Sequence, residues 1–292
     1  PTALEEQIAA GAIGLKANPI AAVFIMPGPA SYVGGDIVSG LLYTGLHREE
    51  PLSLFIDIGT NGEIVLGNRD WLMTAACSAG PAFEGGGLKY GMRAEKGALE
   101  DFSIDPLTFE PMIITIGNVR PKGICGSGLI IMVATLFEMG IINNLGKFDR
   151  DLDTPRIREE NGVYEFVLAW KDETQIDRDI VLTEVDIQNL IRAKGAIYSG
   201  CMTLLTEVGM NIQDIEHIIL AGGFGSYVDL EKAMTIGLLP ETDPYSRQIL
   251  LGLGCFLETL DIAASATSHR TEVTLFPDGL PGAYLDDRRA AR

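Results

Sequence analysis

A carboxylate followed by a glycine-rich turn is the first feature of this sequence that could do chemistry. The segment IDIGTNGEIVL begins at Ile56 and places Asp57 near the end of an apolar run. We expect the backbone N–H groups of Gly59, Thr60 and Asn61 to converge on one point, as they do in anion-binding nests. A phosphate bound there would need a Mg²⁺ ion or an attacking water between itself and Asp57. The alternative is a plain hairpin in which Asp57 caps the turn.

A second glycine-rich turn lies near the end of the chain, in the segment HIILAGGFGSYVDLEKA. Gly222 and Gly223 follow an apolar strand and precede a helix, and a backbone without Cβ atoms offers a flat surface to a planar base. The segment lacks the G-x-G-x-x-G spacing of dinucleotide-binding folds. The alternative is an ordinary connection between a strand and a helix.

Strands and helices alternate in a way that would position both turns. The Asn61-Gly62 pair predicts a hairpin between two strands. Thr183 and Asp186 form a capping box that opens a long helix, and Asp36 stands where it could cap an earlier one. We expect strands over 21–26, 53–58, 62–67, 71–76, 98–104, 112–116, 163–170 and 217–220. We expect helices over 37–46, 126–139, 183–209, 229–237 and 246–264, and a short helix or linker over 2–15. The pattern indicates a mixed α/β sheet.

The charge balance excludes one class of partner. The 292 residues include 22 Lys and Arg against 40 Asp and Glu, a net charge of −18. Nucleic-acid phosphates require a basic surface, so we expect no nucleic-acid partner. Any phosphate must therefore be held locally, by backbone N–H groups and a metal ion.

The cysteines and the absence of export signals indicate a cytoplasmic protein. Cys77, Cys125, Cys201 and Cys255 are far apart in sequence, which favours four reduced thiols over a metal site or a disulfide framework. No signal peptide and no apolar run of membrane-spanning length is present in the sequence, so we expect no membrane partner. The chain begins with Pro1, and we expect it to be a fragment of a longer protein.

The two turns together resemble a known superfamily. A D-x-G-T hairpin lies 165 residues ahead of the Gly-Gly turn, with a long helix between them. That arrangement resembles the actin-like superfamily of sugar kinases, chaperone ATPases and actin. Five strings resemble, more narrowly, the C-terminal ATPase region of the reductive activators of corrinoid proteins. They are SYVGGDIVSGLL, SAGPAFEGGGLKYGMRAEKGALE, GICGSGLIIMVATLFEMGII, TEVDIQNLIRAKGAIYSG and AGGFGSYVDLEKAMTIGLLP.

The resemblance covers about residues 23–264 and implies a fold and a division of the chain. The implied fold is α/β, the actin-like ATPase (ribonuclease H-like) fold, with a mixed sheet flanked by helices. Residues 1–50 would be the tail of the first actin-like lobe with its connection. Residues 51–268 would be the second lobe, which carries the nucleotide motifs, and residues 269–292 a C-terminal tail.

The resemblance also implies roles for residues of the two turns. Asp57 would be catalytic, since it would bind Mg²⁺ through water and position the hydrolytic water. Phosphate would lie against Gly59, Thr60 and Asn61. Gly222 and Gly223 would contact the adenosine of ATP.

The same resemblance gives expectations for further residues. Lys194 is a candidate for reaching the base or ribose, and the alternative is a solvated lysine. Ser127 lies where a helix begins and would favour an anion or an interdomain contact. We do not expect Cys125 to bind a metal, and we interpret the loop that holds Glu84 as structural or partner-contacting. The string GLGC replaces an Asn-containing helix start of the family.

The implied function is ATP-dependent reductive activation. Full-length relatives return the Co(II) corrinoid protein of a methyltransferase system to Co(I), and the electron comes from a [2Fe–2S] cluster in an N-terminal domain. Neither that domain nor the first phosphate loop is in this sequence, so we expect the chain alone to bind ATP weakly. The alternatives are a non-enzymatic actin-like docking module with a vestigial nucleotide site, and a small-molecule kinase. A homodimer is also possible on sequence grounds.

Overall fold

The computed structural model describes residues 6–222, 227–240 and 248–253. The strands are β1 (Glu6–Ala9), β2 (Ala22–Ile25), β3 (Ser53–Ile58), β4 (Gly62–Gly67), β5 (Leu72–Cys77), β6 (Ala98–Ile104), β7 (Pro111–Thr115), β8 (Gly123–Ile124), β9 (Ile157–Glu160), β10 (Val163–Ala169), β11 (Ile180–Thr183), β12 (His217–Ala221) and β13 (Gln248–Leu253). The α-helices are α1 (Gly35–Thr44), α2 (Gly126–Glu138), α3 (Glu184–Glu207) and α5 (Leu230–Thr235). Short 3₁₀ helices are η1 (Ala10–Ile13), η2 (Leu46–Arg48), η3 (Pro81–Glu84), η4 (Lys171–Glu173) and η5 (Ile212–Asp214).

A five-stranded mixed sheet holds both glycine-rich turns. Its strand order is β13-β12-β3-β4-β5. The strands β3, β4 and β5 form an antiparallel meander, whereas β12 pairs in parallel with both β3 and β13. The parallel pairing of β3 with β12 brings together two segments that are more than 150 residues apart in the chain, because β3 ends at Ile58 and β12 begins at His217.

Alternation along β3 divides its side chains between two buried clusters. Leu54, Ile56 and Ile58 face the main core, which α2 and α3 help to build. Phe55 faces a second cluster on the opposite side of the sheet, where α1 packs. A Cβ on Gly40 of α1 would lie 2.8 Å from the Phe55 ring, so this helix contacts the sheet very closely. Helices therefore pack on both faces of the sheet.

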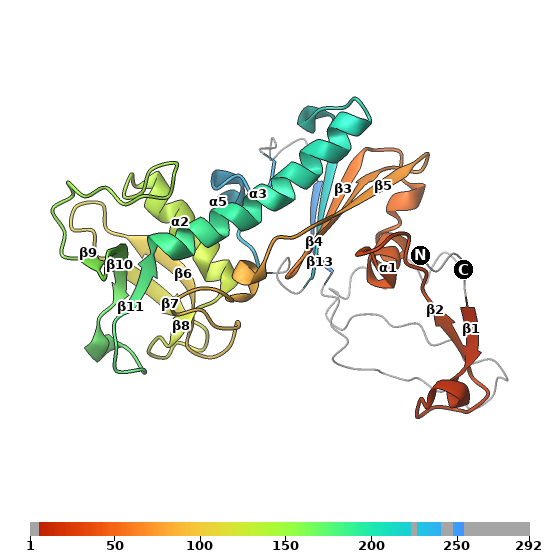
Figure 1. Ribbon diagram of the computed structural model, residues 1–292, viewed down its shortest axis with the longest axis horizontal. Helices are drawn as coiled ribbons and strands as arrows, with labels where there is room; N and C mark the ends of the chain where they lie inside the picture. Colours follow the sequence, from red (N-terminus) through yellow and green to blue (C-terminus); the bar gives the residue numbers. More distant parts are fainter. Residues whose placement is uncertain (1–5, 223–226, 241–247, 254–292) are drawn as a thin grey trace.

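Helix α3 connects the five-stranded sheet to a second region of the molecule (Figure 1). That region contains the three-stranded sheets β7-β6-β8 and β11-β10-β9 together with α2. The predicted capping box is confirmed: the Thr183 hydroxyl accepts the Asp186 N–H at 3.1 Å, and the Asp186 carboxylate accepts the Thr183 N–H at 2.9 Å. The other Asp186 oxygen accepts the N–H of Lys89 at 2.9 Å. The beginning of α3 is thus bonded to the glycine-rich loop.

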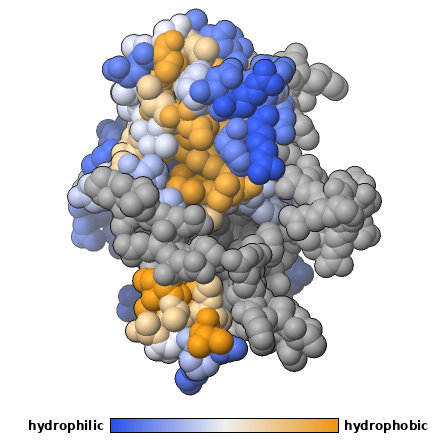
Figure 2. All heavy atoms as spheres, turned by 90° about the vertical axis from the view of Figure 1, so that its right-hand side faces the viewer, coloured by the Kyte–Doolittle hydropathy of each residue, from blue (hydrophilic) through white to orange (hydrophobic). Residues whose placement is uncertain are grey.

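The first strands form a small unit of their own. β1 pairs antiparallel with β2, and the unit lies at the lower right of Figure 1. Ile13, Leu15 and Ile20 are exposed there, and the lower part of Figure 2 shows apolar surface on this unit.

Three predicted elements differ from the structure. The expected helix or linker over 2–15 contains β1 and η1, because Gly14 in a left-handed conformation (φ 72°) ends the 3₁₀ turn. Asp36 does not cap α1: Gly34 is the cap residue, and the Asp36 carboxylate accepts the Ile37 N–H from within the first turn. The helix expected over 246–264 is wrong for residues 248–253, which form β13. A short apolar run is compatible with either a helix or a strand, and pairing with β12 makes this one a strand. Residues 254–264 lie outside the described part.

Candidate functional site

The predicted phosphate turn and the predicted adenosine turn lie side by side. Ala221 pairs with Asp57 in the parallel ladder of β12 and β3, so Asp57 and Gly222 stand at the carboxyl ends of neighbouring parallel strands. Ligands of open α/β sheets bind at this kind of edge. The structure thus brings Asp57 and Gly222 to one place, and Gly223 lies outside the described residues.

Gly222 has a conformation and a position that favour glycine. Its φ is +82°, in the region that side-chain-bearing residues rarely adopt. A Cβ atom there would lie 2.5 Å from Asp57 Oδ1 and 3.0 Å from the Ile58 carbonyl oxygen. The backbone of the second turn therefore lies directly against the carboxylate of the first.

The turn after β3 is a three-residue connection, not a two-residue Asn-Gly turn. Gly62 pairs with Ile58 in the ladder, which leaves Gly59, Thr60 and Asn61 as the loop. The Gly59 N–H donates to the Asn61 carbonyl at 2.9 Å. In this conformation the predicted anion nest therefore has its first N–H group already bonded within the turn.

Glu84 reaches the same turn from η3. The Thr60 hydroxyl donates to Glu84 Oε1 at 2.7 Å, and the N–H of Gly80 donates to the Thr60 carbonyl at 2.9 Å. Both Thr60 and Glu84 are exposed. The glycine-rich loop that we interpreted as structural or partner-contacting thus contributes a carboxylate beside the predicted phosphate position.

Asp57 is one of three carboxylates at this edge. Burial, followed by the negative charges of Glu63 and Asp36, raises the pKa of Asp57 to about 6. The pKa of Glu63 is raised as well, by burial and then by Asp36. Glu63 is the ladder partner of Asp57, and Asp36 comes from α1 on the same face of the sheet. Because the carboxylates repel one another, a bound cation would lower the energy of this site.

The donor set around Asp57 fits one metal–nucleotide arrangement. Among the described residues, no three His, Cys, Asp or Glu side chains are arranged to hold a metal ion. Mg²⁺ typically keeps several waters and takes one or two carboxylates plus substrate phosphates. Asp57 beside the backbone of Gly222 fits that requirement, with the remaining ligands supplied by water and phosphate.

Lys194 bonds to the backbone beside α5. Its ammonium, half-buried on α3, donates to the carbonyl of Ile236, the residue that ends α5. Burial lowers the pKa of Lys194. Lys194 is therefore not a solvated lysine, and it links α3 to the helix that follows the Gly-Gly turn.

Ser127 lies in the first turn of α2, beside Cys125. The Cys125 thiol lies 3.3 Å from the Ser127 hydroxyl and donates to the Leu99 carbonyl at 3.0 Å. A Cβ on Gly126 would overlap the Phe83 carbonyl of η3. The beginning of α2, where we predicted an anion site, is thus packed against Phe83 of η3, the residue before Glu84. Cys77, Cys125 and Cys201 are free thiols.

Three carboxylates of the site were missed from the sequence. Glu63 could have been found, because residues paired across a hairpin share a face and Glu63 lies opposite Asp57. Asp36 and Glu84 are 21 and 27 residues from Asp57, and only the packing of α1 and η3 brings them near.

Comparison with known proteins assigns the chain. Residues 51–259 match the family model described as the C-terminal domain of RACo, the ASKHA domain. The chain belongs to the RACo family. Residues 2–49 match the RACo middle region. The described part of this RACo family member contains no helix that is long and apolar enough to cross a membrane.

Relatives of this RACo family member include named proteins. It is 38% identical over 238 residues to the corrinoid activation enzyme RamQ of Eubacterium limosum. It is 29% identical over 240 residues to the [Co(II) methylated amine-specific corrinoid protein] reductase of Methanosarcina barkeri. These alignments cover 78% and 75% of the chain but only 39% and 40% of the relatives. The chain thus spans about two fifths of their length.

A solved structure is similar in fold. The reductive activator for corrinoid,iron-sulfur protein matches with a TM-score of 0.76 and 52% identity, over 85% of this chain and 39% of that one. The predicted family and the predicted actin-like α/β fold are confirmed.

Proposed function

We propose that this chain is the nucleotide-binding part of an ATP-dependent enzyme that reduces Co(II) corrinoid proteins of methyltransferase systems to Co(I). The observation that carries the proposal is the contact between Asp57 and Gly222 at the ends of two parallel strands. The named relatives act on corrinoid proteins, which supports the same class of partner here.

ATP with Mg²⁺ fits the edge where these residues meet. Asp57 would hold the metal through water, and the turn of Gly59, Thr60 and Asn61 would lie against the phosphates. Gly222 and Gly223 would contact the adenosine. Bound ATP would supply a hydrolysable phosphoanhydride, and the metal would offset both the burial of the Asp57 carboxylate and its repulsion by Glu63 and Asp36, which together raise its pKa to about 6.

The residues of this chain would couple nucleotide binding to a change of conformation, and they would not carry the electron. We expect the electron to come from a [2Fe–2S] cluster outside these 292 residues. That cluster would supply the one electron that reduces Co(II) to Co(I). Nucleotide can favour this uphill step only through different affinities for two conformations or partner states. Asp36 on α1 and Glu84 on η3 come from separate elements around Asp57. Movement of α1 and η3 toward a bound nucleotide would make the nucleotide-bound conformation differ from the free one.

Substitution of Asp57 in the full-length protein tests the proposal. Anaerobic formation of Co(I) on the corrinoid protein is followed by absorption, with and without ATP, together with phosphate release. We expect Asp57→Ala to lower both by about 100-fold, since removal of a charge-stabilising group typically costs that much. Asp70→Ala, an exposed aspartate in the turn between β4 and β5 of the same sheet, serves as the matched control.

Three outcomes would contradict the proposal. Unchanged Co(I) formation in Asp57→Ala would favour a docking module with a vestigial nucleotide site. Co(I) formation that is equally fast without ATP in the unmodified protein would remove the ATP requirement altogether. Formation of ADP without release of inorganic phosphate, in the presence of a small-molecule acceptor, would favour a kinase.

A further inference from the structure

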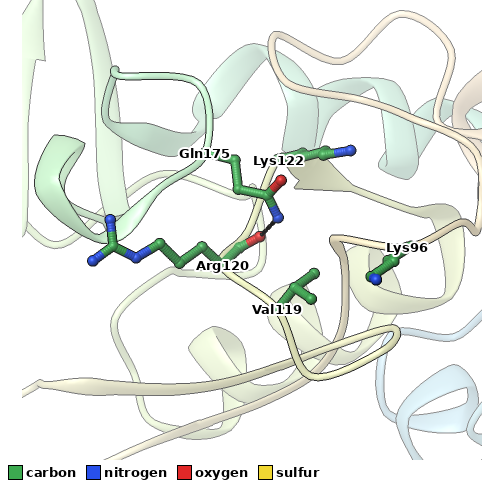
Figure 3. A pocket seen from close by; sticks show the side chains of 5 residues that line it. All are labelled: Lys96, Val119, Arg120, Lys122 and Gln175. Atoms are coloured by element: carbon green, nitrogen blue, oxygen red, sulfur yellow. Dashed lines mark hydrogen bonds between the residues drawn. The ribbon is translucent and has the colours of Figure 1, made fainter.

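A cavity far from Asp57 is lined by positive charge. Its volume is about 530 Å³, and its lining includes Lys96, Val119, Arg120, Lys122 and Gln175 (Figure 3). It lies in the region of β6, β7 and β8, whereas Asp57 lies at the edge of the five-stranded sheet. Three cations around one hollow are unusual in a chain with a net charge of −18.

The three cations have no anionic partner in the part of the chain that the structure describes. Ion pairs there use other basic residues, such as Lys89, Arg156 and Arg158, and none involves Lys96, Arg120 or Lys122. Unpaired like charges repel one another. A ligand with several negative charges would therefore remove repulsion as well as form new contacts.

Hydrogen bonds hold the backbone around the cavity, so the Cα atoms that carry the cationic side chains have defined positions. The N–H of Lys122 donates to the Gly97 carbonyl at 2.8 Å, and the N–H of Gln175 donates to the Pro121 carbonyl at 3.0 Å. The Gln175 side-chain amide donates to the Arg120 carbonyl at 2.5 Å. Three segments from different parts of the chain are thus tied together beneath the charges.

The lysine stems also lie close to backbone. A Cβ on Gly97 would be 3.0 Å from Lys122 Cγ, and a Cβ on Gly117 would be 3.1 Å from Lys96 Cγ. The absence of side chains at these two glycines lets both lysine stems lie along the backbone, which limits the positions of their ammonium groups.

The cations are spread around the rim and do not converge on one point. Figure 3 shows Arg120 extending to the side opposite Lys122, with the Gln175 amide between them. A small anion site needs a few convergent donors. Charges that diverge suit a longer ligand whose negative groups are spaced along a chain.

The surroundings favour protein over a free ion. Strand β7, which leads into the cavity loop, exposes Met112 to 63% and Ile114 to 48%. β7 is also an edge strand of its sheet. Exposed apolar side chains beside a basic hollow are typical of surfaces that bind other proteins.

We propose that this cavity binds a carboxylate-rich segment of a partner protein. Lys96 and Lys122 would pair with carboxylates on one side of the cavity and Arg120 with a carboxylate on the other, while β7 contacts apolar residues of the same segment. The proposal is independent of the nucleotide site, because none of the lining residues belongs to it.

Binding of a fluorescein-labelled hexaglutamate peptide to the full-length protein tests the proposal. Fluorescence anisotropy at low salt gives the affinity, with hexaglutamine as the neutral control peptide. We expect Lys96→Glu with Lys122→Glu to weaken binding by about 10-fold or more, since two rim ion pairs contribute about 1.5 kcal/mol together. The double variant Lys96→Gln with Lys122→Gln should weaken peptide binding less. This variant also avoids placing carboxylates beside Gly97 and Gly117.

A charge-matched variant separates site binding from general attraction. Lys16→Glu with Arg48→Glu changes the net charge equally at exposed positions outside the cavity, and we expect its affinity to stay within about two-fold of the unmodified protein. Equal loss in both double variants would overturn the proposal, and so would unchanged peptide binding in the cavity variant. Binding of inorganic pyrophosphate that depends on Lys96 and Lys122, without peptide binding, would also overturn it in favour of a free-anion site.

Discussion

The carboxylate of Asp57 occupies the space that a side chain on Gly222 would fill. A Cβ at position 222 would be 2.5 Å from Asp57 Oδ1. The two residues are 165 positions apart in the chain and meet because β3 and β12 pair in parallel. Substitutions at either residue should therefore affect the same ligand.

We expect Gly222→Ala to destabilise the protein and to weaken nucleotide binding by about 10-fold or more. The positive φ alone costs a non-glycine residue about 1 kcal/mol, and the contact with Asp57 adds to it. Gly209→Ala is the control, because Gly209 has a φ of +69° with open space around its Cβ position. Urea denaturation and calorimetry with ATP should show a smaller stability loss and unchanged affinity for the control. Equal losses of affinity would contradict the expectation.

We expect Asp57→Asn to stabilise the ligand-free protein at pH 7.5. The folded-state pKa of Asp57 is about 6, above the ordinary value of 3.8, so the folded protein binds this proton more tightly than the unfolded chain does. Stability from this group therefore falls as the pH rises from about 4 to 6 and stays low above that range. Asn avoids this loss of stability, which is about 3 kcal/mol.

The pH dependence supplies the check on Asp57→Asn. Denaturation at pH 4 should show little difference between the variant and the unmodified protein. Asp105 is a control of opposite sign, because the N–H groups of Thr108 and Leu107 lower its pKa. Asp105→Asn should lose stability at pH 7.5, and a gain in both variants would point to a general charge effect.

Thr60 and Glu84 should act as a pair. Their hydrogen bond of 2.7 Å joins the turn after β3 to η3. We expect Thr60→Val and Glu84→Ala each to weaken ATP binding about five-fold, as expected for a bond of about 1 kcal/mol. The double variant should be little worse than either single one, which a double-mutant cycle measures. Additive losses would show that the two side chains act separately.

Lys194 offers a test of its predicted adenosine role. Its ammonium is bonded to the Ile236 carbonyl, so Lys194→Met should cost about 1 kcal/mol of stability through α5. If Lys194 also contacts adenosine, ATP affinity should fall while tripolyphosphate affinity stays the same. Equal changes for both ligands would leave Lys194 with the structural role only.

Glu165 should be important for the second region of the molecule. It is 1% exposed and pairs with Lys89 at 2.7 Å and with Arg158 at 2.9 Å. Glu165→Gln would leave two cations without their shared partner, and we expect a loss of about 3 kcal/mol in urea denaturation. Glu160, an exposed partner of Lys89, provides the comparison, and Glu160→Gln should cost much less.

The sequence predicts elements best where local chemistry decides them. The capping box of Thr183 and Asp186, the buried helix that starts at Gly126 and the strand Ala98–Ile104 all follow from nearby residues. By contrast, Gln248–Leu253 forms a strand only because β12 offers an edge for pairing. A short apolar run does not contain that information.

The site residues likewise divide into those that local sequence predicts and those that only packing brings together. Asp57, its turn and Gly222 could be proposed from two glycine-rich strings. The contributions of Asp36 and Glu84 depend on how α1 and η3 pack, which no local pattern encodes. The internal bond from Gly59 to Asn61 is likewise a property of the folded turn.

Helix α3 has 24 residues and is therefore about 36 Å long. At its beginning Asp186 is bonded to the Lys89 backbone, and near its other end Gly62 and Gly200 allow close contact with Ile197 and Cys77. If it moves as a rigid rod, α3 would transmit displacements between the five-stranded sheet and the second region. The hairpin contacts lie about 20 Å along the helix from its beginning, so a tilt of about 5° there would displace that beginning by about 2 Å. Small movements around the turn after Asp57 would thus be magnified where a partner could sense them.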